Sequence, residues 1–255
     1  MATRKGTFVW YDHLTRDVGA AIAFYSEVVG WKAEPFGDSG YQMWVGSQGP
    51  LGGVMKVTDN SGQGGHPHWM AHLQVDDVDA AAALVKKRGG KICHAPTDIP
   101  TVGRFAVIAD PQGASLSLYR PNQNNMPPHD LGADGEFCWN ELLTSDSAAA
   151  FRFYSELAGW KILEEMDMGP MGTYRVFGLG DTRLGGMMTT SKGAPTPPMW
   201  LCYASTHDLD AAMGRAVGKG ARVTNGPVDI PGGGRVAQLT DPQGAAFALH
   251  QAPRG

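Results

Sequence analysis

Charge is scarce in this chain. Only 18% of its 255 residues are charged, and the formal net charge is −4. Nucleic-acid-binding proteins usually carry a clear excess of basic residues, so this composition argues against that class. No apolar run reaches the roughly 18 residues of a membrane-spanning helix, and no signal-peptide-like apolar segment follows the N-terminus. We therefore expect a cytoplasmic protein without nucleic-acid or membrane partners.

Cysteine is also rare. The chain has three, Cys93, Cys138 and Cys202, an odd number without the spacing of a metal site. Cys138 and Cys202 lie in apolar strand-like segments, where reduced and buried thiols are expected. Apolar residues, in contrast, make up 42% of the chain, and glycine contributes 35 residues. These values predict a sizeable core, rather than a disordered chain, and many tight turns.

The most informative feature that is present is an internal repeat. The segment from Phe8 to Asp17 (FVWYDHLTRD) returns in the second half of the chain as Phe137 to Asp146 (FCWNELLTSD). Two later pairs keep the same order: LGGVM at 51–55 with LGGMM at 184–188, and DPQG at 110–113 with DPQG at 241–244. The spacing between the copies changes only slightly from pair to pair. Such small shifts indicate loop insertions between preserved elements, so the two halves are predicted to be duplicated domains.

The boundary between the halves is predicted from composition. Residues 121–130 (PNQNNMPPHD) are rich in proline and asparagine, as exposed linkers are. We expect a first domain at 1–121, a linker at 122–134 and a second domain at 135–255.

Within the first half, the pattern predicts one strand, a helix and three strands. Residues 8–15 alternate as a strand, Asp17 caps a helix, and Gly30 ends it. Apolar residues recur in that helix at three- and four-residue spacing, at Ala21, Phe24, Tyr25 and Val28. Strands are then predicted near 31–35, 41–45 and 51–57.

The same order follows again within the half. A strand at 69–75 precedes a helix capped by Asp76-Asp77, Gly89 ends that helix, and three strands finish near Tyr119. Each half therefore contains two β-α-β-β-β modules, which predicts an α+β fold.

These motifs, in this order and present twice, resemble the vicinal oxygen chelate superfamily of glyoxalases, ring-cleaving dioxygenases and bleomycin resistance proteins. The resemblance implies two glyoxalase-like domains, each a concave mixed sheet with its helices outside. The closing pattern Asp-Ile-Pro, Gly-Arg and Asp-Pro-Gln-Gly, at 98–113 and 229–244, is similar to two-domain actinobacterial and proteobacterial members that are labelled hydroxylases or antigens.

Metal-using members of that superfamily hold one divalent ion through inward-facing side chains of several strands. Counting from the aspartate landmarks carries the ligand positions onto these residues: Trp10, Gly52-Gly53, Met70 and Ser117 in the first half, and Trp139, Gly185-Gly186, Leu201 and Ala248 in the second. None of these side chains is a good ligand for a hard divalent ion. The sequence thus predicts no metal and no other cofactor.

The same counting yields a candidate polar site in each half. Because strand side chains alternate faces, residues two positions beyond the vacated ones also point inward. They are Asp12, His72 and Tyr119 beside Trp10, and Glu141, Tyr203 and His250 beside Trp139. Such a set could satisfy itself by hydrogen bonds, orient a ligand, act as an acid–base pair through Asp12 or Glu141, or form a relocated metal site.

Two function classes therefore stay open. One is a metal-independent pocket protein that binds or sequesters an apolar or aromatic small molecule, as bleomycin resistance proteins do. Trp10 and Trp139 would stack on the ligand, and His72, Tyr119, Tyr203 and His250 would orient it. The other is an enzyme (a lyase, isomerase, hydroxylase-like catalyst or dioxygenase) that uses Asp12 and Glu141. Since duplication supplies the domain pairing, a monomer or a homodimer is expected.

Two weaker candidates complete the list. Arg104 and Arg235 follow glycine at equivalent positions, where each could anchor an anion or brace a turn. His66 and His68 precede His72 in a glycine-rich loop, but the second half has no equivalent of them.

Overall fold

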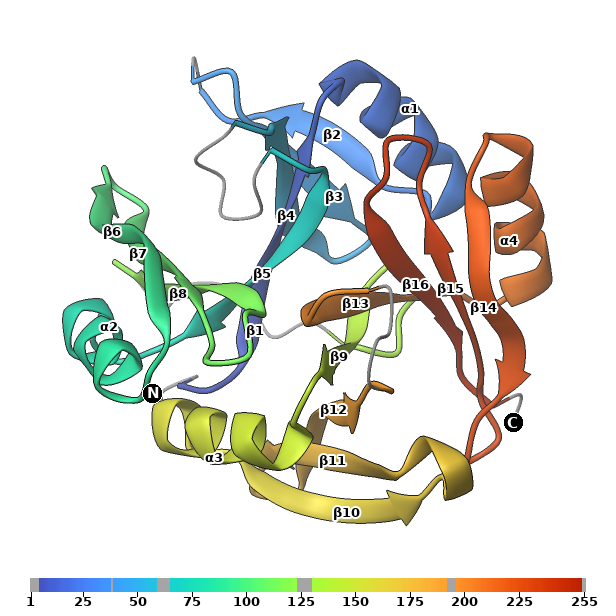
Figure 1. Cartoon of the computed structure of the whole chain (residues 1–255). Helices are drawn as coiled ribbons and strands as arrows, with labels where there is room; N and C mark the ends of the chain where they lie inside the picture. Colours follow the sequence, from blue (N-terminus) through green and yellow to red (C-terminus); the bar gives the residue numbers. More distant parts are fainter. Residues whose placement is uncertain (1–4, 38, 59–64, 123–129, 192–195, 254–255) are drawn as a thin grey trace.

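The computed structural model contains two eight-stranded mixed sheets and four α-helices among residues 5–37, 39–58, 65–122, 130–191 and 196–253, the part of the chain that is described (Figure 1). Each sheet is formed by one half of the chain. The predicted linker at 122–134 lies largely outside the described residues, and the exact domain boundaries stay a prediction.

The first half consists of strands and two helices in the predicted order. They are β1 (Phe8–Thr15), α1 (Val18–Val28), β2 (Lys32–Pro35), β3 (Gln42–Gly46), β4 (Gly49–Lys56), β5 (His68–Gln74), α2 (Val78–Lys87), β6 (Lys91–Ile99), β7 (Gly103–Ala109) and β8 (Ser115–Pro121).

The second half repeats this order, with one additional 3-10 turn. Its elements are β9 (Phe137–Thr144), α3 (Ser147–Ala158), β10 (Lys161–Asp167), η1 (Gly169–Met171), β11 (Thr173–Leu179), β12 (Thr182–Thr189), β13 (Met199–Ser205), α4 (Leu209–Gly218), β14 (Arg222–Asp229), β15 (Arg235–Thr240) and β16 (Ala246–Gln251).

Strand order confirms the predicted modules. The first sheet runs β2-β3-β4-β1-β5-β8-β7-β6, so two groups of four strands meet at the antiparallel pair β1/β5. In each group the first strand pairs in parallel with the last, β1 with β4 and β5 with β8. The second sheet has the same order, β10-β11-β12-β9-β13-β16-β15-β14. The α+β fold expected from the sequence is confirmed.

Each α-helix is preceded by a capping aspartate. Asp17 Oδ1 accepts a hydrogen bond from the Ala20 backbone N–H at 2.9 Å, which satisfies one of the free amides of the first turn. The same cap occurs at the start of the other three helices, at Asp77, Asp146 and Asp208. In α1 the residues buried against the sheet are those that the periodicity predicts, Ala21, Phe24, Tyr25 and Val28.

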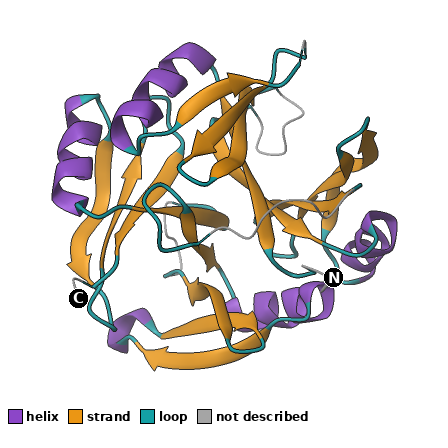
Figure 2. Cartoon of the chain, turned by 180° about the vertical axis from the view of Figure 1, so that it is seen from behind, coloured by secondary structure: helices purple, strands orange, loops and turns teal. Residues whose placement is uncertain are grey.

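The hydrophobic core crosses between the halves. One cluster combines α1 and the strands of the first module with α4 and the last strands of the second half, and α1 lies beside α4 (Figure 1). A second cluster combines α2, β7 and β8 with α3 and β12. Figure 2 shows the helices lying on the outside of the strands. Each half therefore buries its helical side partly against the other half.

The Asp-Pro-Gln-Gly turns take part in both junctions. Asp241 Oδ1 accepts three backbone hydrogen bonds within its own turn, at 2.8–2.9 Å, whereas its Oδ2 accepts one from Tyr25 OH of the other half at 3.1 Å. Asp110 repeats this arrangement with Tyr154 OH, at 3.2 Å. Each turn thus fastens its half to the first helix of the other half.

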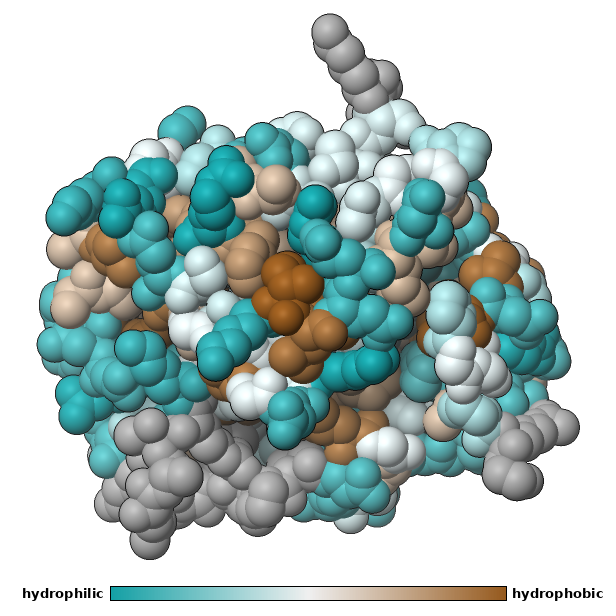
Figure 3. All heavy atoms as spheres, turned by 90° about the horizontal axis from the view of Figure 1, so that it is seen from below, coloured by the Kyte–Doolittle hydropathy of each residue, from teal (hydrophilic) through white to brown (hydrophobic). Residues whose placement is uncertain are grey.

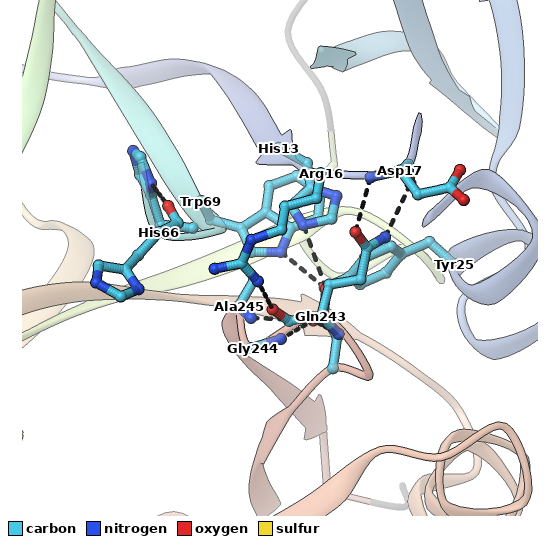
Figure 4. Close-up of polar contacts among 11 residues, drawn as sticks. His13, Arg16, Asp17, Tyr25, His66, Trp69, Gln243, Gly244 and Ala245 are labelled. Carbon is cyan, nitrogen blue, oxygen red and sulfur yellow. Dashed lines mark hydrogen bonds and ion pairs between the residues drawn. The ribbon is translucent and has the colours of Figure 1, made fainter. Parts of the chain in front are cut away.

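The junction at Asp241 holds polar groups that differ from those of the other junction. His13 Nε2 lies 3.2 Å from Asp241 Oδ2, whereas Leu142 occupies the equivalent place in the second half. Gln243 accepts from the Asp17 backbone N–H and donates to the Asp17 carbonyl, both at 2.8 Å (Figure 4). The two junctions are therefore chemically different.

Most large apolar side chains lie in these clusters. In Figure 3 the face seen from below carries small apolar groups set among hydrophilic residues. The described residues include no helix that combines the length and the apolar run needed to cross a membrane.

Candidate functional site

The candidate residues lie on the face of each sheet that the helices leave open. In the pair β1/β5, Trp10 lies opposite His72 and Asp12 opposite Met70. Opposite residues share a face, and their neighbours in sequence point to the other one. Tyr11 belongs to the cluster that packs on α1, so Trp10, Asp12 and His72 face away from the helices.

Asp12 is the centre of a hydrogen-bonded group in the first half. Its Oδ1 accepts from Tyr41 OH at 2.5 Å and from Trp10 Nε1 at 3.1 Å, and its Oδ2 lies 2.9 Å from His72 Nε2. Trp10 Nε1 also donates to Tyr41 OH, at 2.7 Å. The sequence-predicted residues Trp10, Asp12 and His72 are thus brought together, and Tyr41 joins them.

The surroundings of Asp12 favour its charged form. Burial by itself would raise the pKa of this carboxyl, but the His72 imidazole and the hydrogen bonds from His72, Tyr41 and Trp10 lower it below its ordinary value. The Tyr41 hydroxyl, buried beside that carboxylate, has a pKa far above its usual range. Asp12 is therefore ionised at neutral pH, and Tyr41 is a neutral donor to it.

Tyr119 is only an edge neighbour of this group. Its ring stands perpendicular to the His72 ring, with centroids 6.0 Å apart, and its hydroxyl donates to the Val102 carbonyl at 3.3 Å. Burial, followed by the charge of Asp12, raises the pKa of its hydroxyl. Tyr119 therefore flanks the imidazole without binding the carboxylate.

Glu141 is the corresponding centre in the second half. Its Oε2 accepts from Tyr203 OH at 2.8 Å and from Gln238 Nε2 at 3.0 Å, and Gln238 Nε2 lies 2.8 Å from Tyr203 OH. Trp139 Nε1 donates to Tyr174 OH at 3.0 Å, as Trp10 does to Tyr41. The second carboxylate is thus held by uncharged donors.

This difference shifts the pKa of the second carboxyl group in the opposite direction from that of Asp12. Burial raises the pKa of the Glu141 carboxyl above its ordinary value, and the hydrogen bonds from Tyr203 and Tyr174 offset only part of that effect. A tyrosine, Tyr203, stands where the first half places the imidazole that stabilises a negative charge. The protonated form of Glu141 therefore persists to higher pH than that of a solvated glutamate.

His250 does not join the Glu141 group. Its Nδ1 lies 3.6 Å from Cys138 Sγ, and burial lowers the pKa of the imidazole. Burial also raises the pKa of the Cys138 thiol to about 12, which makes it a poor nucleophile. The expectation that carboxylate, histidine and tyrosine would lie together thus holds for Asp12 and His72, but not for Glu141 and His250.

A match to known proteins covers both halves. Residues 7–118 and 139–249 each match the model of the glyoxalase/bleomycin resistance protein/dioxygenase superfamily. The chain belongs to this superfamily.

Superfamily relatives extend along the whole chain. The Mycobacterium tuberculosis protein named "Putative glyoxylase CFP32" is 34% identical, over 96% of this chain and 95% of its own length. The anthracycline biosynthesis protein DnrV of Streptomyces peucetius is 33% identical, over 98% of this chain and 94% of its own. The Mn(II)-bound glyoxalase from Novosphingobium aromaticivorans has the same fold, with a TM-score of 0.67 at 16% identity over 99% of this chain and 84% of that one.

The superfamily's metal positions can be compared with the observed register. Met70 lies opposite Asp12, Ser117 lies beside His72, and Gly53 lies beside Asp12, so these positions do converge near Trp10. The donors that converge are a thioether and a hydroxyl, which do not suit a hard divalent ion. No group of three or more His, Cys, Asp or Glu in the described segments could hold a metal ion. The residues present do not fit the metal.

The sequence did not predict that Tyr41 and Tyr174 would lie beside the two carboxylates. An ideal Cβ on Gly53 would collide with the phenol of Tyr41, and one on Gly186 would collide with that of Tyr174. Each tyrosine thus fills the space above a glycine at the vacated metal position. A signal existed in the sequence, because the two tyrosines are separated by the same spacing as the two Leu-Gly-Gly segments.

The weaker sequence candidates have other roles. Arg104 forms two hydrogen bonds with Asp79 of α2, at 2.7 and 3.0 Å, and Arg235 forms the equivalent pair with Asp210 of α4, at 2.8 and 3.1 Å. These contacts support the bracing interpretation rather than anion anchoring. His68, the first residue of β5, has its Nδ1 2.7 Å from the His66 carbonyl, so this contact ties the preceding loop to the strand.

Proposed function

We propose that this chain binds an apolar or aromatic small molecule on the open face of its sheets without the divalent ion of its metal-using relatives. The observation that carries the proposal is the indole–tyrosine pair beside a buried carboxylate, which occurs in both halves at the former metal positions. An indole whose N–H is already bonded presents a fixed aromatic surface, and fixed aromatic surfaces bind flat ligands well.

Names of relatives suggest a first ligand to test. Two of them are named for anthracycline biosynthesis, and anthracyclines are built on fused, flat, hydroxylated rings. A planar hydroxyanthraquinone matches both this chemistry and the Trp10 and Trp139 surfaces. We therefore choose 1,2-dihydroxyanthraquinone as the probe.

Isothermal titration of the full chain with this probe tests the proposal. We expect saturable binding that is unchanged by prior treatment with EDTA, and at least about tenfold weaker binding to the double variant Trp10→Ala/Trp139→Ala, the effect of losing the aromatic anchor of each half. Val217→Ala, which removes an exposed apolar side chain of α4, serves as the control. Absence of saturable binding, or binding that requires added Mn²⁺, would contradict the proposal.

Catalysis is the second candidate, and one contact favours it. His72 and Asp12 form a charge-assisted pair at 2.9 Å, an arrangement that orients an imidazole for proton transfer. A relocated metal site has less support, because Asp12 and His72 together provide only two ligands.

A further inference from the structure

We propose that the first half alone carries an acid–base centre, in which His72 Nδ1 takes a proton from an acidic hydroxyl group of a bound aromatic ligand. This inference rests on the proposed binding function and assigns it to one half of the chain, to one atom and to a ligand class. It is carried by the geometry of His72 and by the residues that replace it in the second half.

The hydrogen bond to Asp12 determines which nitrogen of His72 is basic. Asp12 is ionised, so its Oδ2 accepts, and the hydrogen in the 2.9 Å contact belongs to His72 Nε2. The lone pair of the neutral ring is then on Nδ1. Among the described residues, none forms a hydrogen bond with His72 Nδ1, and this atom is not among the fully buried polar atoms without a partner. The His72 side chain is 10% exposed. Nδ1 is therefore open to a ligand.

Asp12 is suited to hold this ring in place. Its second oxygen already accepts from Tyr41 and Trp10, so the carboxylate cannot turn away without breaking two hydrogen bonds. The titratable groups that face His72 are Asp12 from β1, Tyr41 from the approach to β3, and Tyr119 from β8. Both tyrosine hydroxyls stay neutral because burial raises the pKa of each.

The proton transfer involves only the ligand, His72 and Asp12. The ligand O–H bond breaks and an Nδ1–H bond forms, which leaves a ligand oxyanion and an imidazolium. The imidazolium keeps its Nε2–H on Asp12, and that carboxylate supplies the opposite charge. The reverse transfer restores both partners. The step consumes no oxidant or further reactant.

The second half differs at the positions of Asp12, His72 and Tyr119. Tyr203 occupies the place of His72, and its hydroxyl is engaged by both Glu141 and Gln238. Gln238 itself stands where the first half has Val107. His250, the equivalent of Tyr119, lies against Cys138 instead of the carboxylate. The polar groups described around Glu141 are thus occupied by one another, and the same proton transfer is not available there.

The test uses the visible spectrum of bound 1,2-dihydroxyanthraquinone, which moves to longer wavelength when a hydroxyl ionises. For the probe bound in the first half of the wild-type chain, we expect the pH midpoint of this change to lie at least about one unit below that of the free probe, whereas probe bound in the second half keeps the free midpoint. In His72→Gln, which still donates to Asp12, binding is retained and the midpoint returns to that of the free probe. His207→Gln is the matched control, since 81% of that side chain is exposed, before α4 in the other half.

Two further variants keep the test decisive. His72→Tyr copies the residue of the second half and is expected to abolish the shift, even if His72→Gln fails to fold. Asp12→Asn should reduce the shift, because the imidazolium loses its opposite charge, and this identifies Asp12 as a positioning residue. A merely structural role would change affinity without moving the midpoint.

The outcomes separate the two proposals. Binding with an unshifted midpoint would overturn the acid–base centre and leave the binding function standing. A shift that survives in His72→Gln, or is lost only in Glu141→Gln, would also overturn it. Absence of binding would remove both.

Discussion

Single glycines determine where the two site tyrosines can lie. Gly53 and Gly186 are neighbours of the carboxylate-bearing residues across the parallel strand pairs, and their missing side chains leave the space that Tyr41 and Tyr174 occupy. Any larger residue would meet a phenol ring. The vacated metal position is thus filled by an aromatic ring from the neighbouring strand rather than left empty.

Gly53→Ala is expected to displace Tyr41 and lower the free energy of unfolding by about 1–3 kcal/mol, the usual effect of overpacking. The tyrosine could swing outward, but it would then lose its bonds to Trp10 and Asp12. Gly214→Ala in α4 is the control, since its added Cβ meets nothing within 4 Å. That change should stabilise the protein by about 0.5–1 kcal/mol in urea unfolding. Equal effects of the two changes would contradict this account.

The two carboxylates should respond to neutralisation with opposite signs. Burial raises the pKa of folded Glu141, so its contribution to stability is present in acid and is lost as pH rises through the folded pKa. We expect Glu141→Gln to be more stable than wild type at pH 8, with the advantage vanishing toward pH 4. Urea midpoints measured across this range test it, and an advantage that grows in acid would refute it.

Asp12→Asn is expected to change stability in the opposite direction from Glu141→Gln. The folded pKa of Asp12 is lowered, so its contribution is present above the ordinary carboxyl pKa and is lost as pH falls. The variant should therefore be less stable than wild type at pH 8, and the deficit should shrink in acid. The same urea titration provides the measurement. A deficit independent of pH would mean that lost packing, not charge, dominates.

The order of elements could be read from the sequence, because a helix or strand leaves a periodic apolar pattern. The residues of α1 that face the core, and the landmarks around Asp17 and Gly30, are of this kind. Partners that come from distant strands leave no such pattern. The contacts of Asp12 with Tyr41, of Glu141 with Gln238 and of His13 with Asp241 depend on register and on packing between halves, which local periodicity does not contain.

His13 in β1 should make the junction at Asp241 sensitive to acid. Burial lowers the pKa of this imidazole, although Asp241 acts in the opposite direction, so the folded protein holds it neutral. Its contribution to stability is then present above the ordinary histidine pKa and is lost as pH falls. We expect the urea midpoint of wild type to fall more steeply from pH 8 to pH 5 than that of His13→Leu. His66→Leu, at an exposed site, should leave the slope unchanged.

At the scale of the whole molecule, the two sheets share their cores. The two large hydrophobic clusters both contain residues from both halves, whereas a third, small cluster around Tyr203 belongs to the second half alone. Trp31 Nε1 and Trp160 Nε1 donate across the junctions to the Gly135 and Gly6 carbonyls, at 2.7 and 2.6 Å. Separating the halves would expose the apolar side chains of the two large clusters to water. The halves are thus topologically separate but energetically joined.

We therefore expect one cooperative unfolding transition for the full chain. Tryptophan fluorescence and far-ultraviolet circular dichroism should give the same urea midpoint, and calorimetric and van't Hoff enthalpies should agree. Tryptophan fluorescence reports mainly on the shared clusters, and circular dichroism reports on both sheets. Two resolved transitions would show that each half is stable by itself.

The unlike junctions have a consequence for how such a chain can change over time. In a dimer of two identical single-half chains, every substitution appears on both sides of the symmetry axis, so a buried histidine would face both turns or neither. Covalent fusion removes this coupling: His13 stands at one turn while Leu142 stands at the other. Joining the copies made each position independently mutable, and the histidine beside Asp12 and the tyrosine beside Glu141 show the divergence that such freedom allows.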